Sequence, residues 1–561
     1  MEALVMVGAL ATFLVFVFAL EAFRVRKAER EYVKKLYEDY RKLSDKKYSP
    51  ERFLKLGSYF ERHRTEGQLD DVTWNDLGMD ELFKRMNHTL SASGEEYLYH
   101  VLRTPRQDRE YLERFEEIVE CIGSRPDERV RLQYCMHRLG YTGKYSLYDY
   151  IDNLECLGVR NNRKHLVTDL LFLPLTAMLW VNFSAGILGI VALAIFNIFT
   201  YFKDKNEIDP YVTSFAYVLR LMAACEELEK LELPAAREEL EKLGAYGKKL
   251  QPMRRGAFWI MTGRRTDLTS GDILGILLDY VRMVFHVDLI QFNRMLRILR
   301  GHVEDVDALI GTAGYLETAA AVWIFRQSLE EGWCRPEFLE EGGCGIELEE
   351  GYHPLLKHPV KNSIRADRGV LLTGSNASGK STFLKTVAVN AILAQTVNTV
   401  AADGYKAPFF HIYSSMALRD DMENGESYYI VEIRSLKRIL DAAAGRHRVL
   451  CFVDEVLRGT NTVERVAAST EILRSLGGRG ILCFAATHDI ELTGLLSGVF
   501  DNYHFEEDVR DGDVSFQYKL HRGRASTRNA IRLLELLGYD RDITEKAAAL
   551  ADQFLQTGKW E

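Results

Sequence analysis

The sequence lacks the features that mark several common classes of protein. Its eight cysteines include no C-x-x-C pair, which argues against a zinc site or a disulfide framework and favours reduced cysteines in a cytosolic setting. Basic residues are not in excess, because 72 lysines and arginines stand against 81 aspartates and glutamates, for a net charge of −9. This balance argues against bulk non-specific coating of nucleic acid, although a local basic patch could still bind DNA.

The composition is that of a folded protein of several domains. Hydrophobic residues make up 47% and charged residues 27% of the 561 residues, which excludes a mainly disordered chain. At roughly 150 residues per domain, the length allows three or four domains.

Charged residues are missing from a first long run, residues 3–20, in which Thr12 is the only clearly polar side chain. At about 1.5 Å per residue a helix here would extend about 27 Å, close to the thickness of a bilayer core. A secretory signal peptide would carry positive charge before the run, but Glu2 stands there. The basic residues follow the run: Arg24, Arg26, Lys27 and Arg30. The positive-inside rule therefore predicts that residues 1–23 form a transmembrane anchor, with the rest of the chain in the cytoplasm.

A second uncharged run covers residues 170–202. A single helix of that length would extend about 50 Å, too long for one span. A break at residues 182–186 (NFSAG) would divide residues 166–202 into two helices, and basic residues on both flanks favour a transmembrane hairpin that returns to the cytoplasm. The alternative is a hairpin buried in a soluble protein, but such helices rarely run uncharged for so long.

Most of the remaining chain before residue 342 has helical periodicity. Residues 24–73 are charged and predict a juxtamembrane helical stalk, whose basic side chains either contact anionic lipid or form a solvated helix face. Apolar residues at helical spacing predict two parts of an all-α core, or lever, domain at residues 74–165 and 203–341.

The character changes in residues 342–527, where short apolar runs at residues 369–373, 448–453 and 480–486 alternate with helical patterns. Strands of this kind predict an α/β domain with a mainly parallel sheet covered on both faces. A last helical segment is predicted at residues 528–561.

A glycine-rich loop follows the first of these strand-like runs and precedes a helical run. It fits G-x-x-x-x-G-K-[ST] with Gly374, Ser375, Asn376, Ala377, Ser378, Gly379, Lys380, Ser381 and Thr382. Glycines let backbone N–H groups approach phosphates, and the following helix N-terminus favours negative charge. Lys380 is expected to reach the β- and γ-phosphates and Ser381 to coordinate Mg²⁺. The pattern predicts ATP and Mg²⁺ as ligands and a P-loop fold.

The ends of the other two apolar runs carry residues suited to hydrolysis. Asp454 would hold the Mg²⁺ shell, and Glu455 would polarise the attacking water as general base. Taken alone, an acidic pair at a strand end is as often a helix cap. His488 could sense the γ-phosphate, although a lone histidine is usually structural. Together with the loop, these residues predict an ATP hydrolase with Lys380, Glu455 and His488 as catalytic residues.

These motifs resemble the MutS family of DNA mismatch-repair ATPases, a branch of the ABC-type ATPases. The resemblance is carried by LLTGSNASGKSTFLK, VDEVLRGTNT and ATHDIEL, and by residues 351–354, 420–432, 501–505 and 518–523. It extends upstream to residues 82–94 and 102–105, which look like the start of the family's helical lever domain. In total it covers roughly residues 74–160 and 206–555.

The resemblance implies a homodimer with composite ATP sites. Ser427 would approach the γ-phosphate of the ATP bound by the partner subunit, and the loop with Gly459 and Thr460 would link the two sites. His488 would be the switch residue, and residues 528–561 would form a dimerisation segment.

Three positions depart from the family's pattern. Leu457 stands where glycine is usual, Tyr428 stands where threonine is usual, and Asp489-Ile490 replaces an aromatic–histidine pair. These departures concern the contact across the dimer and the coupling between sites, and they leave phosphate and metal binding unaffected.

The family's mismatch-reading domain, which inserts a Phe-x-Glu wedge into DNA, has no counterpart of sufficient length in residues 24–73. Residues 115–117 match the letters of the wedge, but they lie in a charged helical run and are interpreted as an ordinary helix. Another candidate contact is residues 248–265, with Phe258-Trp259 between basic residues and no acidic ones: Lys248, Lys249, Arg254, Arg255, Arg264 and Arg265. This stretch is either a patch for phosphates or lipid, or a solvated loop with a packed tryptophan.

The sequence therefore predicts a multi-pass protein of the cell membrane with its ATPase in the cytoplasm. Its ATP cycle would open and close a dimeric helical clamp on duplex or branched DNA near the lipid bilayer. The alternative is a mechanochemical ATPase that acts on a membrane or a protein and not on DNA, favoured by the missing wedge, the hairpin and the acidic charge. An ABC transporter is disfavoured, because no LSGGQ-like signature stands between the phosphate loop and Asp454.

Overall fold

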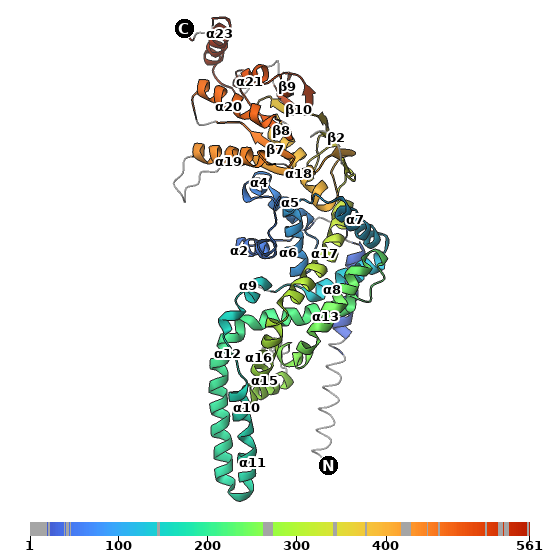
Figure 1. Ribbon diagram of the computed structural model, residues 1–561, viewed down its shortest axis with the longest axis vertical. Helices are drawn as coiled ribbons and strands as arrows, with labels where there is room; N and C mark the ends of the chain where they lie inside the picture. Colours follow the sequence, from blue (N-terminus) through green and yellow to red (C-terminus); the bar gives the residue numbers. More distant parts are fainter. Residues whose placement is uncertain are drawn as a thin grey trace. The chain divides into compact units, whose positions relative to one another are not determined.

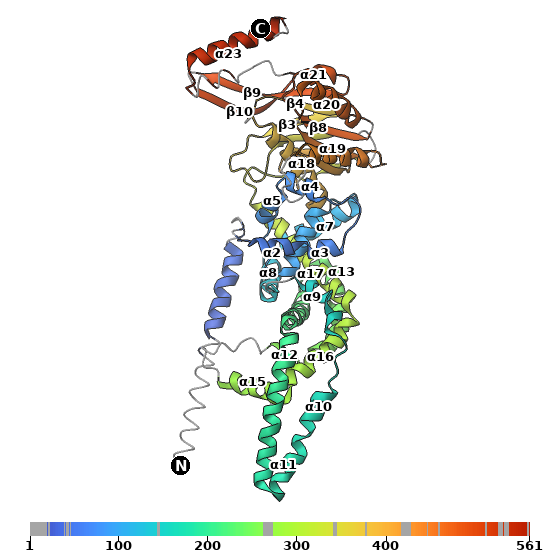
Figure 2. The same cartoon turned by 90° about the vertical axis from the view of Figure 1, so that its left-hand side faces the viewer.

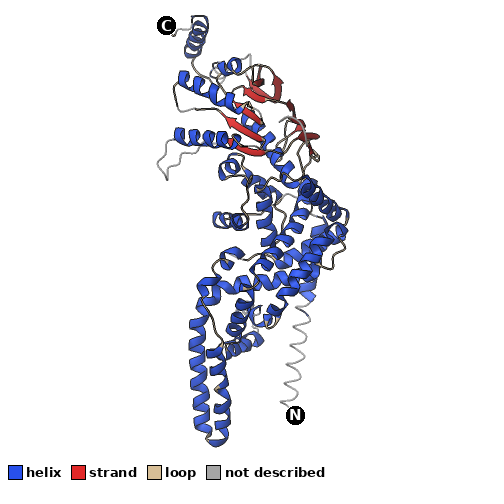
Figure 3. Cartoon of the chain, viewed as in Figure 1, coloured by secondary structure: helices blue, strands red, loops and turns tan. Residues whose placement is uncertain are grey.

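The computed structural model divides into two compact units, which are described separately. The first comprises residues 1–63, 87–100 and 117–325, and the second residues 64–86, 101–116 and 326–561. All described strands belong to the second unit (Figure 3). The structure describes residues 20, 23–38, 40, 44, 46–142, 146–261, 273–339, 345–375, 378–416, 428–445, 447–457, 460–478, 480–510, 513–524, 531, 534, 538–557 and 560.

The first unit is built from helices, and residues 23–38 are helical ahead of the labelled elements. The division between the units falls within α6, α7 and α17. In chain order the elements are α2 (Pro50–Leu54), η1 (Lys55–Gly57), α3 (Ser58–Arg62), α6 (Ala92–Arg103), α7 (Arg109–Ser124), α8 (Pro126–Leu139), α9 (Leu147–Ile151), η2 (Leu154–Leu157), α10 (Arg163–Leu170), α11 (Phe172–Val181), α12 (Phe183–Leu228), η3 (Pro234–Ala236), α13 (Arg237–Leu250), η4 (Gln251–Arg254), α14 (Ala257–Met261), α15 (Ile273–Phe285), α16 (Val287–Arg300) and α17 (Val303–Gln327).

The helices α11 and α12 form an antiparallel hairpin (Figure 1). Asn182 separates them, because its extended backbone interrupts the helix while its side chain accepts the N–H of Ala185 and caps α12. Gly186 lies so close to Leu179 that an added Cβ would come within 2.8 Å of its side chain. The predicted break at residues 182–186 is therefore confirmed.

The second arm of the hairpin does not end at residue 202. α12 continues without interruption to Leu228 and contains Pro210. The sequence suggested an end at 202 because charged residues begin at Lys203, but charge changes which face of a helix is solvated and does not stop it. The polarity of α12 changes along its length while its backbone continues.

Helix 23–38 and the segment that follows it both pack on the rest of the first unit. Tyr37 donates a hydrogen bond to Asp127 of α8 at 2.7 Å, and Arg52 donates one to the buried Glu95 of α6 at 2.8 Å. Residue 73, suggested as the end of a stalk, lies inside α4, which Asp70 caps.

The second unit contains two sheets. Its helices are α4 (Asp71–Asp76), α5 (Met79–Met86), α18 (Lys380–Val397), α19 (Tyr428–Ala443), α20 (Thr462–Leu476), α21 (Glu491–Leu495) and α23 (Arg541–Thr557). The four-stranded sheet has the order β1 (Glu337–Phe338), β5 (Gly404–Ala407), β2 (Ile346–Gly351) and β3 (Asn362–Ala366). The six-stranded sheet has the order β10 (Asp513–Arg522), β9 (Phe500–Arg510), β4 (Gly369–Thr373), β8 (Ile481–Ala486), β7 (Val449–Asp454) and β6 (His411–Ser415).

The six-stranded sheet is parallel except at one edge. β4, β6, β7, β8 and β9 pair in parallel, and β10 pairs antiparallel with β9 (Figure 2). The three predicted apolar runs are the central strands β4, β7 and β8, so the expected mainly parallel sheet is confirmed. The sequence did not predict the four-stranded sheet or the β9–β10 ribbon.

Both faces of the central strands are covered. Cys451, Val453, Cys483 and Ala485 share a buried cluster with side chains of α19, α20 and α21. Alternate residues such as Phe452 point to the opposite face, and α18 contacts β7 and β8. This burial on both sides explains why β7 and β8 are apolar throughout and end in polar residues only at their carboxyl ends.

Candidate functional site

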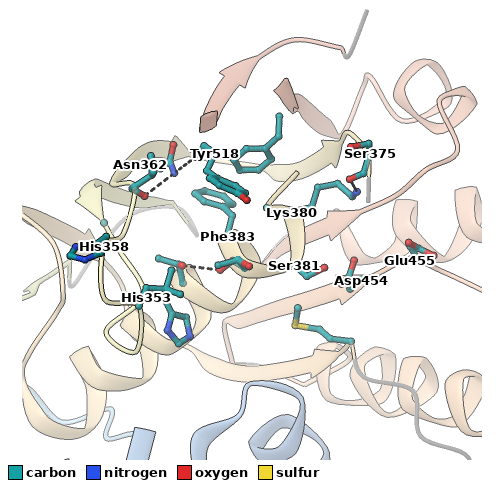
Figure 4. Close-up of a pocket in the computed structure, with 18 residues that line it drawn as sticks. His353, His358, Asn362, Ser375, Lys380, Ser381, Phe383, Asp454, Glu455 and Tyr518 are labelled. Atoms are coloured by element: carbon teal, nitrogen blue, oxygen red, sulfur yellow. Dashed lines mark hydrogen bonds between the residues drawn. The ribbon is translucent and has the colours of Figure 1, made fainter. Parts of the chain in front are cut away.

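A cavity of about 760 Å³ lies in the second unit at the carboxyl ends of β4 and β7 (Figure 4). Ligands of open parallel sheets bind at this edge. The cavity is lined by Gly351, His353, Leu356, His358, Val360, Asn362, Ser375, Gly379, Lys380, Ser381, Thr382, Phe383, Thr386, Met416, Asp454, Glu455, Phe505 and Tyr518.

The loop between β4 and α18 requires glycine at both ends. Gly374 has a φ of 144°, and an added Cβ would lie 2.9 Å from Ser378 Oγ and 3.0 Å from the carbonyl oxygen of Phe505. Gly379 has a φ of 108°, and its Cβ would lie 3.1 Å from Tyr518 Cδ1. L-residues rarely adopt such φ values. The backbone of the loop can therefore approach a phosphate closely.

Lys380 is the first residue of α18 and is only 5% exposed. Its Nζ donates to the carbonyl oxygens of Gly374 at 2.8 Å and Ser375 at 2.7 Å. The buried hydroxyl of Ser378 has no hydrogen-bond partner among the described residues. An ammonium group, an unsatisfied hydroxyl and a helix N-terminus in one loop suit an anionic ligand.

Asp454 and Glu455 lie where β7 ends. Asp454 is 8% exposed, whereas Glu455 has a left-handed φ of 58° and donates its N–H to the carbonyl of Ala486 at 2.9 Å. Leu457 is also left-handed, with a φ of 61°, and its N–H donates to the buried carboxylate of Glu432. This strained turn separates the directions of two adjacent carboxylates, so that one can serve a metal and the other a water molecule.

His488 joins the two sides of the site. Its Nε2 lies 2.9 Å from Glu455 Oε1 and 3.5 Å from Lys380 Nζ. The structure therefore brings together the three residues that the sequence predicted as catalytic, and Asp454 and Ser381 line the same cavity. Their chemical roles stay predictions.

Some predicted site residues lie elsewhere. Thr460 precedes α20, where its hydroxyl donates to Glu464 at 3.2 Å, and it does not line the cavity. Asn376, Ala377, Ser427 and Gly459 lie outside the described residues.

The sequence did not predict Tyr518 as a site residue. β9 and β10 lose register between Phe516 and Leu520, and Tyr518 in this bulge has a φ of 52°. Asn362 holds the bulge, because its side-chain amide donates to the Tyr518 carbonyl at 2.9 Å and accepts the N–H of Leu520 at 2.8 Å. The bulge turns an aromatic ring toward the phosphate loop (Figure 4).

His353 lies in the wall of the cavity and carries no charge at neutral pH. Burial, with a smaller effect of Lys385, lowers its pKa to about 4. Among the described residues no cluster of three or more histidine, cysteine, aspartate or glutamate side chains could hold a metal ion. A hydroxyl and one carboxylate, as supplied by Ser381 and Asp454, are nevertheless the hard oxygen ligands with which Mg²⁺ is bound alongside phosphates.

The two sequence features considered for DNA contact are engaged within the protein. Phe115 is 1% exposed inside α7, which confirms that it belongs to an ordinary helix and is not a wedge. In the basic stretch, Lys249 pairs with Asp305 at 2.6 Å. Arg254 pairs with Glu226, and Lys248 lies 3.9 Å from Glu229. Arg264 and Arg265 lie outside the described residues.

Comparison with known proteins agrees with this geometry. Residues 370–555 match the family model for MutS domain V. The chain is 33% identical over 228 residues to the DNA mismatch repair protein MutS of Thermus thermophilus, covering 40% of this chain and 27% of that protein. It is 32% identical over 251 residues to the Aquifex pyrophilus protein of the same name, covering 43% and 28%. It is 29% identical over 284 residues to that of Lactobacillus delbrueckii subsp. bulgaricus, covering 48% and 32%.

These alignments span only about a quarter to a third of the length of the relatives. The residues matched by the family model include the phosphate loop, Asp454, Glu455 and His488. The C-terminal ATPase region of the chain, residues 370–555, is therefore similar to domain V of the MutS family.

Proposed function

We propose that this chain is an ATP hydrolase whose ATP cycle works in a membrane-anchored homodimer. The observation that carries the proposal is that Lys380 and Glu455 line one cavity at the phosphate loop and that His488 lies within 3.5 Å of both, in a region similar to MutS domain V.

Each residue at the cavity has a different role in the proposed transfer of the γ-phosphoryl group to water. Lys380 exchanges its two carbonyl partners for the phosphate oxygens of ATP and neutralises developing charge. Glu455 orients the attacking water and accepts its proton. His488, in contact with Glu455, holds that carboxylate on the γ-phosphate side. Ser381 and Asp454 would hold Mg²⁺, which neutralises charge on the phosphates when bound.

A second part of the cavity, next to the phosphate loop, is proposed to supply a surface for the nucleobase. Tyr518, Leu356 and Val360 line it, and the ring of Tyr518 is 44% exposed. An aromatic face next to a phosphate loop suits stacking of a purine, which fixes ATP at its other end.

The α11–α12 hairpin supports membrane insertion. Arg163–Val181 and Phe183–Leu228 are long and apolar enough to span a bilayer, and only 6% and 11% of their most apolar windows are buried. A third such helix, α17, has 78% of its window buried and is a core helix. The 19 residues of the first arm extend about 28 Å at 1.5 Å per residue, which matches a bilayer core of about 30 Å.

Ion pairs mark the base of the hairpin. Lys164 pairs with Asp204 at 2.6 Å and Arg160 with Glu207 at 2.5 Å, while Trp180 near the tip is 92% exposed. Charged pairs at one end and an aromatic at the other suit the two interfaces of a membrane. The ATPase then lies in the cytoplasm. Residues 1–19, which include most of the predicted N-terminal anchor, lie outside the described residues.

A chain that starts at residue 24 tests the hairpin alone. Val191→Lys with Ile195→Lys should abolish flotation with liposomes, since each charge near the bilayer centre costs about 3 kcal/mol. Val159→Lys, at a position 97% exposed outside the hairpin, is the matched control and should float as the parent does. Equal flotation of all three chains would rule out insertion of the hairpin.

Duplex or branched DNA is the proposed target, on the strength of the family and of relatives named as DNA mismatch repair proteins. The second candidate is a mechanochemical ATPase acting on the membrane or on a protein. It is favoured by the exposed hairpin and by the internal pairing of Lys249 and Arg254.

The ATPase rate of the detergent-purified protein, with and without homoduplex, mismatched and branched DNA, separates the two candidates. Lys380→Ala serves as the blank. Stimulation that falls with salt supports DNA as the target. Basal turnover that no DNA changes, even at low salt, supports the membrane or a protein.

A further inference from the structure

A bidentate ion pair joins α20 to the residue after His488. Arg465 donates from Nε to Asp489 Oδ2 at 2.9 Å and from Nη2 to Oδ1 at 2.6 Å. The two side chains are 26% and 14% exposed. Because both carboxylate oxygens are engaged by a planar fork, the pair fixes the direction of Asp489 as well as its distance.

His488 is flanked by two anchored residues. The N–H of Thr487 donates to a carbonyl of β4 at 3.0 Å, and the N–H of Asp489 donates to Thr487 Oγ1 at 3.0 Å. The fork of Arg465 then secures the side chain of Asp489. The backbone on both sides of His488 is therefore held, and this sets the direction of the imidazole that lies 2.9 Å from Glu455.

Arg465 also connects this segment to the start of α20. The helix begins at Thr462 with Asn461 as its cap, directly after the loop that the MutS resemblance assigns to communication between ATP sites. The hydrogen bond to Asp489 is the main cause that raises the pKa of Arg465, and the carboxylate of Glu455 adds to it. One guanidinium thus pairs with Asp489 and lies close enough to Glu455 to feel the charge of its carboxylate.

We propose that Arg465 and Asp489 are positioning residues for ATP hydrolysis. The pair holds His488 against Glu455 and makes this orientation depend on the start of α20. The proposal rests on the proposed ATPase activity. It also gives a role to Asp489, which stands where the MutS family usually has an aromatic residue: the carboxylate provides a fixed contact with Arg465 that an aromatic side chain could not make.

A double-mutant cycle with His488 tests this role. For the full-length protein in detergent, we expect Asp489→Ala to lower kcat about 10-fold with KM for ATP within about 2-fold, since misplacing a reacting group slows chemistry without weakening binding. In a His488→Ala background, the same change should lower kcat less than about 2-fold. Arg474→Ala is the control, because Arg474 lies on the same helix and pairs with Glu471 and the carbonyl of Leu495 rather than with Asp489.

A second variant tests the proposal if Asp489→Ala does not fold. Arg465→Lys keeps the charge but cannot form the fork, and it should show the same loss of kcat and the same dependence on His488. An unchanged kcat, or an equal loss with and without His488, would overturn the proposal. If Lys380→Ala hydrolyses ATP as fast as the parent, the ATPase assignment itself fails, which is a separate result.

Discussion

Replacing Tyr518 should weaken the binding of ATP without slowing its hydrolysis. The ring lies beside the phosphate loop at Gly379, and Tyr518 lines the cavity and is 44% exposed to solvent. Of the three side chains proposed to be catalytic, His488 lies 2.9 Å from Glu455 and 3.5 Å from Lys380. A change at the ring is therefore expected to affect KM and to leave kcat within about 2-fold.

The size of the effect follows from what the ring can contribute. Stacking of a base on an aromatic side chain is worth about 1–3 kcal/mol. Since about 1.4 kcal/mol corresponds to a factor of ten, Tyr518→Ala should raise KM for ATP roughly 5- to 140-fold. Tyr518→Phe keeps the ring and should behave as the parent does.

Inorganic tripolyphosphate provides the decisive comparison, because it has the phosphates of ATP and no base. Competition binding should show that Tyr518→Ala loses affinity for ATP and keeps its affinity for tripolyphosphate. An equal loss for both ligands would mean that Tyr518 supports the loop at Gly379 and does not stack on the base. Unchanged affinity for ATP would mean that the base lies elsewhere.

Three further outcomes are expected. Lys380→Ala should lose ATP binding, while Glu455→Gln should bind ATP and hydrolyse it at least 100-fold more slowly, as measured by equilibrium binding and steady-state turnover. Glu432→Ala removes the acceptor of the Leu457 N–H beside the general base; it should lower both kcat and the free energy of unfolding, the latter by about 1–3 kcal/mol in denaturant titrations. Burial raises the pKa of Glu96 from 4.5 to about 8. The stability that the protonated carboxyl contributes is therefore fully present below the ordinary pKa and is lost as pH rises to about 8, so Glu96→Gln should make the fall of Tm between about pH 5 and 8 shallower.

The phosphate loop and the strand-end residues could be predicted because each signal is local. Gly374 to Thr382 form one contiguous motif at the junction of a strand and a helix, Asp454 ends the apolar strand β7, and His488 follows the apolar strand β8 by two residues. Parallel strands place their carboxyl ends at one edge of a sheet, so the order of motifs already implies that the residues meet. The structure brings them together there.

The parts that sequence reasoning missed depend on contacts distant in the chain. Tyr518 faces the cavity because Asn362, over 150 residues earlier, holds a bulge in β10. Glu432 was recognised as part of a motif, but its bond to Leu457 depends on a left-handed turn that the sequence does not signal. Leucine adopts that conformation rarely, so its occurrence follows only from the surrounding packing.

The hairpin shows the same division between local and distant signals. Asn182 is a strong helix cap in a stretch with glycines, and the break occurs there. The continuation of α12 to Leu228 was missed because the first charged residue, Lys203, suggests the end of the helix. The change from apolar to charged residues there marks only where the apolar surroundings of the helix end. Hydropathy locates where a helix leaves an apolar medium, and it does not locate where the helix ends.

The question of the target now turns on which surfaces carry unpaired positive charge. Binding to the DNA backbone releases counterions in proportion to the cations available to phosphates. Lys249 and Arg254, the best candidates by sequence for contacts with DNA phosphates, are paired with Asp305 and Glu226. Phe115, the candidate for a wedge, is a buried residue of α7. Charge reversal of Lys249 and Arg254 should therefore leave DNA-stimulated turnover unchanged. If it abolishes stimulation, these ion pairs open on DNA, and residues 248–265 are the contact that the sequence first suggested.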